Sequence, residues 1–168
     1  AALARRRDLG CGGLTLVSCD NLPDNGRVLA NLLTDYLERQ DGALAVWAAR
    51  NTACPNAVVD RIVPAVTDAD IETLSDTAGF VDRAMVATEP FRQWIIENRF
   101  AGPRPRWEAG GAQIVDDVRP FELAKLRMLN GSHSTLAYVG IGLSLDFVHE
   151  AITDPALRKL VRIQMARE

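Results

Sequence analysis

The sequence predicts a chain with two parts, an α/β part up to about residue 115 and a helical part from about residue 116. In the first part, short continuous apolar runs alternate with amphipathic helical stretches, which is typical of buried strands covered by helices. From residue 116 onward, the apolar residues follow a helical spacing nearly to the end. The length of 168 residues allows one good hydrophobic core or two small ones.

The elements of the α/β part each have a local signal. The apolar run Leu14–Cys19 indicates a buried strand of a parallel sheet, and the polar turn 20–26 leads from it into a helix. Asp68 is expected to be the N-cap of a later helix. The expected helices cover residues 1–8, 27–39, 43–50 and 68–77, and the expected strands cover residues 14–19, 57–63, 88–100 and 114–115.

The helical part is expected to begin with a helix that Asp116 or Asp117 caps and that has Pro120 in its first turn. A last helix is expected to start around Pro155. Bends are expected at the two glycines inside the helical pattern, Gly131 and Gly140.

Composition narrows the classes of function. A net charge of −3, with 48% hydrophobic and 24% charged residues, is typical of a soluble globular protein and gives no reason to expect a nucleic-acid partner. No apolar run approaches the roughly 18 residues that a membrane span needs. The three cysteines lack metal-binding spacing and no signal peptide is evident, so we expect no metal site and a cytoplasmic location.

The most informative segment is the predicted helix over residues 122–136, which places polar side chains of different chemistry among leucines. On an α-helix that turns by about 100° per residue, Asn130 lies roughly 140° and His133 roughly 80° from Lys125. Glu122 lies at roughly 60°. The leucines that share this arc are Leu126, Leu129 and Leu136. A solvated face would carry more charge, so the pattern indicates a polar cluster set into a packed wall, as in a binding site.

The chemistry of these groups suits acid–base catalysis on an alcohol or a ketone. Burial among leucines disfavours the charged form of Lys125, so its amine could act as a base near neutral pH. The amide of Asn130 could stabilise an alkoxide, His133 could orient the same oxygen, and Glu122 could relay the proton outward. Spacing alone supports equally well a helix whose polar side chains pair with a neighbouring domain.

Local patterns favour structural roles for three other groups. Asn21 follows a predicted strand, where α/β proteins bind ligands, but an Asx turn that caps the next helix explains this segment better. Asp60 and Arg61 interrupt an apolar run, and a structural ion pair is the better interpretation for them. The tryptophans, which are expected in the core, are Trp47, Trp94 and Trp107.

Five ordered motifs resemble the signature segments of the mannitol dehydrogenase family, the polyol-specific long-chain dehydrogenases and reductases. The family includes mannitol 2-dehydrogenase, arabinitol dehydrogenase, and the fructuronate and tagaturonate reductases. The motifs extend over essentially the whole chain, with x for an unspecified position. They are Ser18–Gly26 (SCDNLPxNG), Pro55–Thr67 (PNxxVDRIVPxxT), Glu89–Glu97 (EPFxQWxIE), Arg104–Glu108 (RPxWE) and Lys125–Tyr138 (KLRMLNGSHSxLAY).

The resemblance implies the fold and the reaction. Residues 1–115 would be the C-terminal end of a Rossmann-like dinucleotide-binding domain, and residues 116–168 would begin an all-helical substrate domain. The activity would be a metal-independent hydride transfer between NAD or NADP and a secondary alcohol of an open-chain polyol, or the corresponding ketose. The small-molecule partner would thus be a polyol, a ketose or a sugar acid.

The resemblance also implies roles for individual residues. Lys125 would be the general base in oxidation and the general acid in reduction. Asn21 and Asn130 would form the oxyanion hole, and His133 would bind and orient the substrate. The residues implied to support the lysine are Asp60, through hydrogen bonds, and Glu122, which would gate its proton exchange. The residues implied to bind the cofactor are Ser18, Asn21 and Val59.

The chain begins without Met and ends inside a helical pattern, so we expect a segment of a longer protein. On that expectation, the isolated chain would bind cofactor weakly and show little activity. The particular substrate, the choice between NAD and NADP, and the oligomeric state, for which a monomer is plausible, stay open. Two alternatives also stay open, namely a uronate reductase of the same family and a noncatalytic binding module on the same scaffold.

Overall fold

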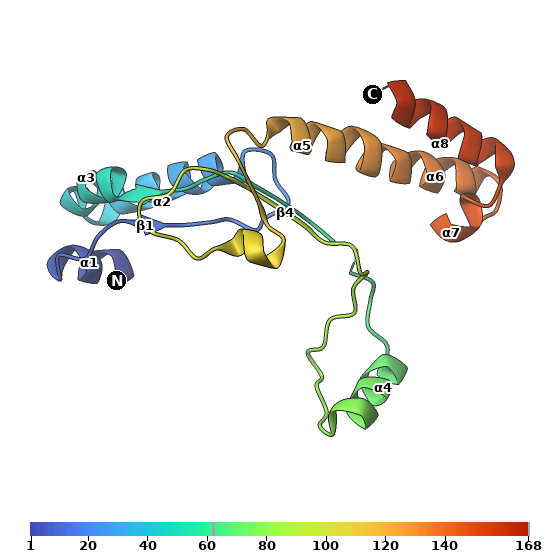
Figure 1. Ribbon diagram of the computed structural model, residues 1–168, viewed down its shortest axis with the longest axis horizontal. Coiled ribbons are helices and arrows are strands. Elements are labelled where there is room, and N and C mark those ends of the chain that lie inside the picture. Colours follow the sequence, from blue (N-terminus) through green and yellow to red (C-terminus); the bar gives the residue numbers. More distant parts are fainter. Residues whose placement is uncertain (62, 168) are drawn as a thin grey trace. The chain divides into compact units, whose positions relative to one another are not determined.

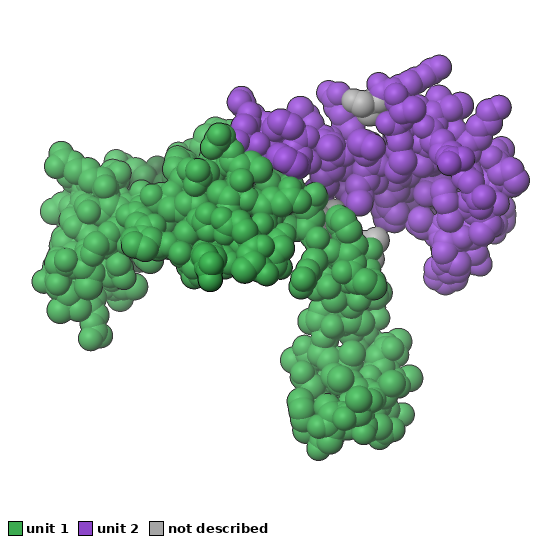
Figure 2. Space-filling model, viewed as in Figure 1, with its two compact units in different colours: residues 1–116 green, residues 117–168 purple. Residues whose placement is uncertain are grey.

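A computed structural model describes residues 1–61 and 63–167, with Asp60 described by its backbone alone. The chain divides into two compact units, residues 1–116 and residues 117–168 (Figure 2). The first unit combines strands with helices, and the second is helical (Figure 1). The predicted order of an α/β part followed by a helical part is therefore confirmed.

Three helices of the first unit pack around a small apolar cluster. They are α1 (Ala2–Asp8), α2 (Asn25–Gln40) and α3 (Gly42–Asn51). The buried members of the cluster are Leu37, Leu44, Ala45 and Ala48, against which Leu3, Ala4, Leu33 and Trp47 pack. Asp41 begins α3, because its carboxylate accepts a hydrogen bond from the backbone N–H of Leu44 at 2.9 Å. The end of α2 and the start of α3 are thus joined by one capped turn.

The strands of the first unit form two small sheets. β1 (Leu14–Thr15) pairs in parallel with β2 (Thr52–Ala53). The second sheet contains β3 (Ala57–Asp60), β4 (Gln93–Glu97) and β5 (Gln113–Val115) in this order. β3 runs antiparallel to β4, and β4 runs parallel to β5. The core of this sheet lies at Ala57, Val58, Ile95 and Ile96, all of which are buried.

These strands are shorter than the apolar runs predict. β1 pairs over two residues only, because its partner lies between the end of α3 and Pro55, which has no N–H to donate. The parallel direction expected for the strand that begins at Leu14 is confirmed by the β1–β2 pair. Ile62, within the expected strand 57–63, lies outside the described residues.

α4 (Asp68–Ala78) begins with a capping box, in which Thr67 and not Asp68 is the N-cap. The carboxylate of Asp70 accepts from the backbone N–H of Thr67 at 2.8 Å, and the backbone N–H of Asp70 donates to the Thr67 hydroxyl at 3.3 Å. The expectation for Asp68 is wrong because an acid at the third helical position completes the box only with a hydroxyl at residue 67.

The second unit consists of helical segments. α5 (Arg119–Ala124), the π-helical segment η2 (Lys125–Asn130) and α6 (Gly131–Gly142) follow one another without a break, and α7 (Val148–Ala151) and α8 (Pro155–Arg167) come after them. The buried cluster of the unit is formed by Leu136, Ala151, Leu157 and Val161. Among the helices that the structure describes in either unit, none is long and apolar enough to cross a membrane.

Two local expectations for this unit are wrong. The N-cap of α5 is Val118, and Asp117 instead accepts from the backbone N–H of Arg119 at 3.0 Å, with Pro120 in the first turn as expected. Gly131 does not bend the chain, because its φ of −62° and ψ of −45° are helical. At Gly140 a Cβ would lie 3.3 Å from the Cβ of Ala151, so glycine there allows a close approach of α7.

Candidate functional site

The helix that carries the KLRMLNGSHS motif changes its hydrogen bonding between Lys125 and Asn130. The backbone N–H of Gly131 donates to the carbonyl of Leu126, which lies five residues back instead of four. Such π-helical segments take up one more residue than an α-helical turn, and they occur frequently at functional sites. The π-helical hydrogen bonding therefore lies inside the segment that the sequence analysis identified as the most informative.

This extra residue brings the polar side chains of the motif closer to one line along the helix. With one residue taken up by the π turn, Asn130 lies about 40° and His133 about 20° from Lys125. An uninterrupted α-helix would place them about 140° and 80° away. Glu122, on the preceding α-helical turn, stays about 60° away. The four side chains, which we call the KNHE face, thus share an arc of about 80°.

The KNHE face is not enclosed by the second unit. Three of its side chains are half-buried, namely those of Glu122, Lys125 and Asn130. The imidazole of His133 is exposed. Leu126 and Leu129 are each 43% exposed, whereas Leu136 is only 6% exposed. The expectation of a packed apolar wall is therefore wrong for this chain except at Leu136, because the buried cluster of the unit is built by α6, α7 and α8.

In the first unit, Asn21 lies in an exposed turn that is anchored by Asn25. The Asn25 side chain is buried, at 2% exposure, and its N–H groups donate to the carbonyls of Asp20 at 2.9 Å and Ala57 at 2.8 Å. Its Oδ1 accepts from the backbone N–H of Ala57 at 2.9 Å. Asn25 thereby links Asp20, the residue before Asn21, to β3. The interpretation as a local Asx turn does not include this long-range contact.

A second long-range contact, made by Asn56, fixes the start of α2. The side-chain oxygen of Asn56 accepts from the backbone N–H groups of Gly26 at 3.0 Å and Arg27 at 3.2 Å, so a residue distant in sequence caps the helix. A Cβ at Gly26 would overlap the carbonyl of Pro55, which explains the glycine. The motifs around Asn21 and around Asn56 therefore form one packed unit.

A cavity of about 710 Å³ opens at the Asn21 turn, a size typical of small-molecule sites. It is lined by Asn21, Val59, Arg61, Arg92, Gln93, Trp94, Arg106, Trp107, Gly110, Gly111 and Ala112. Two residues implied to bind the cofactor, Asn21 and Val59, are among them, whereas Ser18 is not. The described lining residues include three arginines and no carboxylate, so the cavity favours an anionic or hydrogen-bond-accepting ligand.

Arg61 holds one wall of this cavity in place. Its Nε donates to the carbonyl of Phe91 and its Nη2 to the carbonyl of Glu89, both at 3.0 Å. Arg61 thus links the end of β3 to the segment before β4. The side chain of Asp60, expected to pair with Arg61 and to support the lysine, lies outside the described residues.

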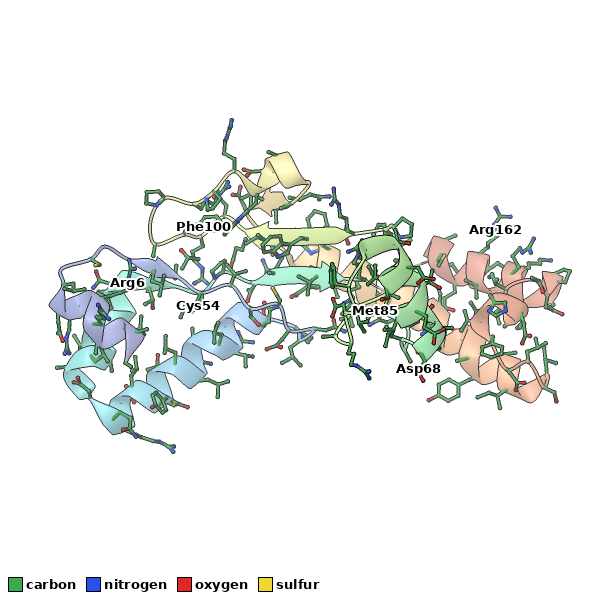
Figure 3. All side chains as sticks on the ribbon, turned by 90° about the horizontal axis from the view of Figure 1, so that it is seen from below. Arg6, Cys54, Asp68, Met85, Phe100 and Arg162 are labelled. Carbon is green, nitrogen blue, oxygen red and sulfur yellow. The ribbon has the colours of Figure 1, made fainter. Side chains whose placement is uncertain are left out.

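Two tryptophans that were expected in the core form part of the cavity wall. The rings of Trp94 and Trp107 lie with centroids 5.4 Å apart, and both side chains are only half-buried. Trp107 also contacts Phe100, labelled in Figure 3, at a centroid distance of 6.0 Å. Trp47, by contrast, packs against the apolar cluster of α2 and α3 as expected.

An ion pair braces the segment that carries Trp107. The guanidinium of Arg104 donates to both carboxylate oxygens of Glu108, at 2.7 Å and 2.6 Å, and lies 4.9 Å from the centroid of the Phe100 ring. The pair spans the start of the 3₁₀ turn η1 (Trp107–Gly110). These hydrogen bonds to Arg104 lower the pKa of Glu108 to about 2.

This pair predicts an acid-dependent change in the cavity wall. Because the folded-state pKa of Glu108 is depressed, its contribution to stability is complete above the ordinary value of 4.5 and is lost as the pH falls towards about 2. We expect carboxyl-carbon NMR to show Glu108 titrating near 2 in the wild type and near its ordinary value in Arg104→Gln. Equal midpoints in the two proteins would contradict the pairing.

The structure places the predicted site residues in two groups, one in each unit. Glu122, Lys125, Asn130 and His133 share one helix face, and Asn21 and Val59 share one cavity. Sequence reasoning considered Arg61 only as an ion-pair partner of Asp60, and it missed Arg92 and Arg106, which stand at unspecified positions inside the motifs Glu89–Glu97 and Arg104–Glu108. Within the described part of the chain, no group of three or more His, Cys, Asp or Glu residues could hold a metal ion.

Comparison with known proteins matches both units to one family. Residues 1–109 match the mannitol dehydrogenase Rossmann domain, and residues 117–168 match the mannitol dehydrogenase C-terminal domain. The D-mannonate oxidoreductase of Escherichia coli is 44% identical over 99% of this chain. This chain spans 34% of that protein, about a third of its length.

Two solved structures have the same fold as this chain. A substrate-free D-sorbitol dehydrogenase matches 95% of the chain with a TM-score of 0.88 and 39% identity. Mannitol 2-dehydrogenase of Pseudomonas fluorescens, in a ternary complex with NAD and D-mannitol, matches 98% of it with a TM-score of 0.79 and 41% identity. The chain covers 33% of each of these two structures. The Rossmann-like fold expected for the first part is therefore confirmed.

Proposed function

Because this chain belongs to the mannitol dehydrogenase family, we propose that the protein carrying it is an NAD(P)-dependent polyol dehydrogenase. It would oxidise a secondary alcohol of an open-chain polyol, or reduce the corresponding ketose. The observation that carries this proposal is the KNHE face, where the π-helical segment η2 aligns an amine, an amide, an imidazole and a carboxylate. Such a set can bind an alcohol, accept its proton and stabilise the resulting oxygen charge.

Lys125 is the proposed general base in oxidation and the general acid in reduction. Its amine would take the proton of the alcohol as the carbon is oxidised, and the amide N–H of Asn130 would stabilise the charge that develops on the oxygen. His133 lies on nearly the same line of the helix as Lys125 and would orient the substrate. Glu122, one turn before the lysine, would pass the proton to solvent.

Asn21 would donate its amide N–H to the oxygen of the substrate, a role that its motif supports. The hydrogen bonds of Asn25 hold this turn in position and so reduce the entropy that Asn21 loses when it binds a ligand. Asp60 would support the lysine, an assignment that rests on its motif alone.

The residues present fit part of a dinucleotide cofactor. Asn21 and Val59 line one cavity, and Gly110 and Gly111 leave room for a ligand beside them. NAD or NADP, when bound, supplies the hydride acceptor of the oxidation. Ser18 lies three residues after the end of β1, on the segment that leads to Asn21, and would contact the cofactor from there.

A sugar acid is a second candidate substrate, favoured by the three arginines of the cavity. The E. coli relative named D-mannonate oxidoreductase supports it, and the ternary complex with D-mannitol supports the neutral polyol. The reaction class and the proposed roles of Lys125 and Asn130 are the same for both.

The proposal is tested with the longest open reading frame that contains this chain. We expect the purified protein to oxidise D-mannitol, D-sorbitol or D-mannonate with NAD or NADP, in an assay of reduced-nicotinamide absorbance. Treatment with a chelator followed by dialysis should leave the turnover unchanged, because the proposed acid–base and charge-stabilising groups are all side chains. Absence of turnover with every open-chain polyol, sugar acid and ketose would contradict the proposal, and loss of turnover on chelation would contradict its metal independence.

A further inference from the structure

The described residues that line the cavity at the Asn21 turn concentrate positive charge. Arg61, Arg92 and Arg106 all line it, and the described lining residues include no Asp or Glu. Among the described residues, none of the three guanidinium groups forms an ion pair. Three cations in one cavity repel one another, and an anionic ligand would relieve this repulsion.

The three arginines differ in what their guanidinium groups already bind. Arg61 uses Nε and Nη2 to hold the carbonyls of Phe91 and Glu89, so its main role is to position the segment that leads to Arg92. Nη2 of Arg92 lies 4.0 Å from the place where a Cβ of Gly111 would be, and Gly111 itself has a φ of +95°. The Arg92 guanidinium therefore lies against a glycine wall of the cavity.

Arg106, which lines the same cavity, directly precedes η1. The acid nearest to it in this segment, Glu108, is held by both oxygens in the ion pair with Arg104. Arg106 acts on Glu108 only through its field, as the weakest of the effects that lower the Glu108 pKa. Its guanidinium donors thus stay available for a ligand.

We propose that Arg92 and Arg106 form an anion subsite that binds the carboxylate of an open-chain sugar acid. Guanidinium groups bind carboxylates through paired, charge-assisted hydrogen bonds, which are stronger and more directional than those to a hydroxyl. The proposal rests on the proposed function, because Asn21, which would hold the reacting oxygen, lines the same cavity. A phosphate of the cofactor is the other source of the same chemistry, and the test separates the two.

The test compares two substrates that differ at one end only, D-mannonate with a carboxylate and D-mannitol with a hydroxymethyl group. The variants Arg92→Gln and Arg106→Gln are made in the longest reading frame that contains this chain. The control is Arg39→Gln, on the exposed side of α2. Circular dichroism checks that each variant is folded.

We expect the wild type to prefer D-mannonate and each cavity variant to lower kcat/KM for it by about 10- to 100-fold, the loss typical of one charge-assisted hydrogen bond. The value for D-mannitol should stay within about twofold, as should KM for NAD and all values of the control. Equal losses for both substrates would overturn the proposal, because they would indicate a structural role. A rise of KM for NAD alone would overturn it in favour of a cofactor phosphate.

Direct binding keeps this proposal separate from the proposed function. Calorimetry should show that D-mannonate binds to the wild type and binds weakly or not at all to the Arg92→Gln, Arg106→Gln double variant, whether or not turnover occurs. If the wild type turns over no open-chain polyol, sugar acid or ketose but binds D-mannonate through these arginines, the proposed function fails and the subsite stands. If the wild type oxidises D-mannitol and does not bind D-mannonate, the subsite fails and the proposed function stands.

Discussion

Replacing Lys125 with methionine, in the longest reading frame that contains this chain, should lower kcat by about 10²- to 10⁴-fold. Methionine preserves the length and helix propensity of the side chain but removes the amine that the proposed mechanism uses to accept the proton. The binding of substrate should change much less, because Asn130 and His133 remain on the same face. Steady-state kinetics with the preferred substrate and a thermal unfolding scan measure both effects.

Lys159 provides the matched control, because it is the only other lysine of the chain and is exposed on α8. Lys159→Met should leave kcat within about twofold and the unfolding temperature unchanged. Normal turnover of Lys125→Met would rule out the lysine as the general base. The catalytic role requires a loss of turnover in a variant that unfolds at the same temperature as the wild type.

The π-helical segment allows a second test, of the geometry and not of the amine. Inserting one alanine into η2, after the half-exposed Met128, adds a residue that the existing π turn does not take up. Asn130 and His133 would then rotate by about 100° relative to Lys125, with every functional group still present. We expect turnover to fall as much as in Lys125→Met while the helical content is retained. Full activity after the insertion would show that the alignment of the KNHE face is not needed.

The sequence predicts the existence of the KNHE face but not its register. An apolar spacing near 3.6 residues is compatible with α5, η2 and α6 alike, and nothing in the run KLRMLN indicates where an extra residue is taken up. The register depends on how α5 and α6 are each held, which is a tertiary property. Sequence reasoning therefore placed these four side chains in a wider arc of the helix than the one they share in the structure.

The cavity was beyond sequence reasoning for a related reason. Arg61 follows β3, Arg92 precedes β4 and Arg106 precedes η1. They come together because β4 pairs with β3 on one edge and with β5 on the other. The direction of the β3–β4 pair is set by these long-range contacts, whereas an apolar run reports burial alone. Helices were easier to predict, because their caps and periodicity are local: α2 and α3 lie within two residues of the expected bounds.

Asn25 should be among the most sensitive positions of the first unit. Asn25→Ala would leave the carbonyls of Asp20 and Ala57, and the N–H of Ala57, without the partners they now have. Each buried polar group that loses its partner lowers the free energy of unfolding by about 1–3 kcal/mol. We therefore expect Asn25→Ala to lower it by about 3 kcal/mol or more. Hydrogen exchange of the Ala57 amide, followed by mass spectrometry, measures this loss at β3.

Asn25→Ala should also impair substrate binding, because Asn25 donates a hydrogen bond to the carbonyl of Asp20, the residue before Asn21. Freed from this contact, the turn would sample other conformations, and KM should rise more than kcat falls. Asn31→Ala, on the exposed side of the same helix, removes the same amide and should change stability by no more than about 0.5 kcal/mol. Equal effects of the two variants would mean that the buried hydrogen bonds do not hold the turn. If only Asn25→Ala lowers stability and raises KM, the hydrogen bonds of Asn25 between the Asn21 turn and β3 support both the fold and the cavity.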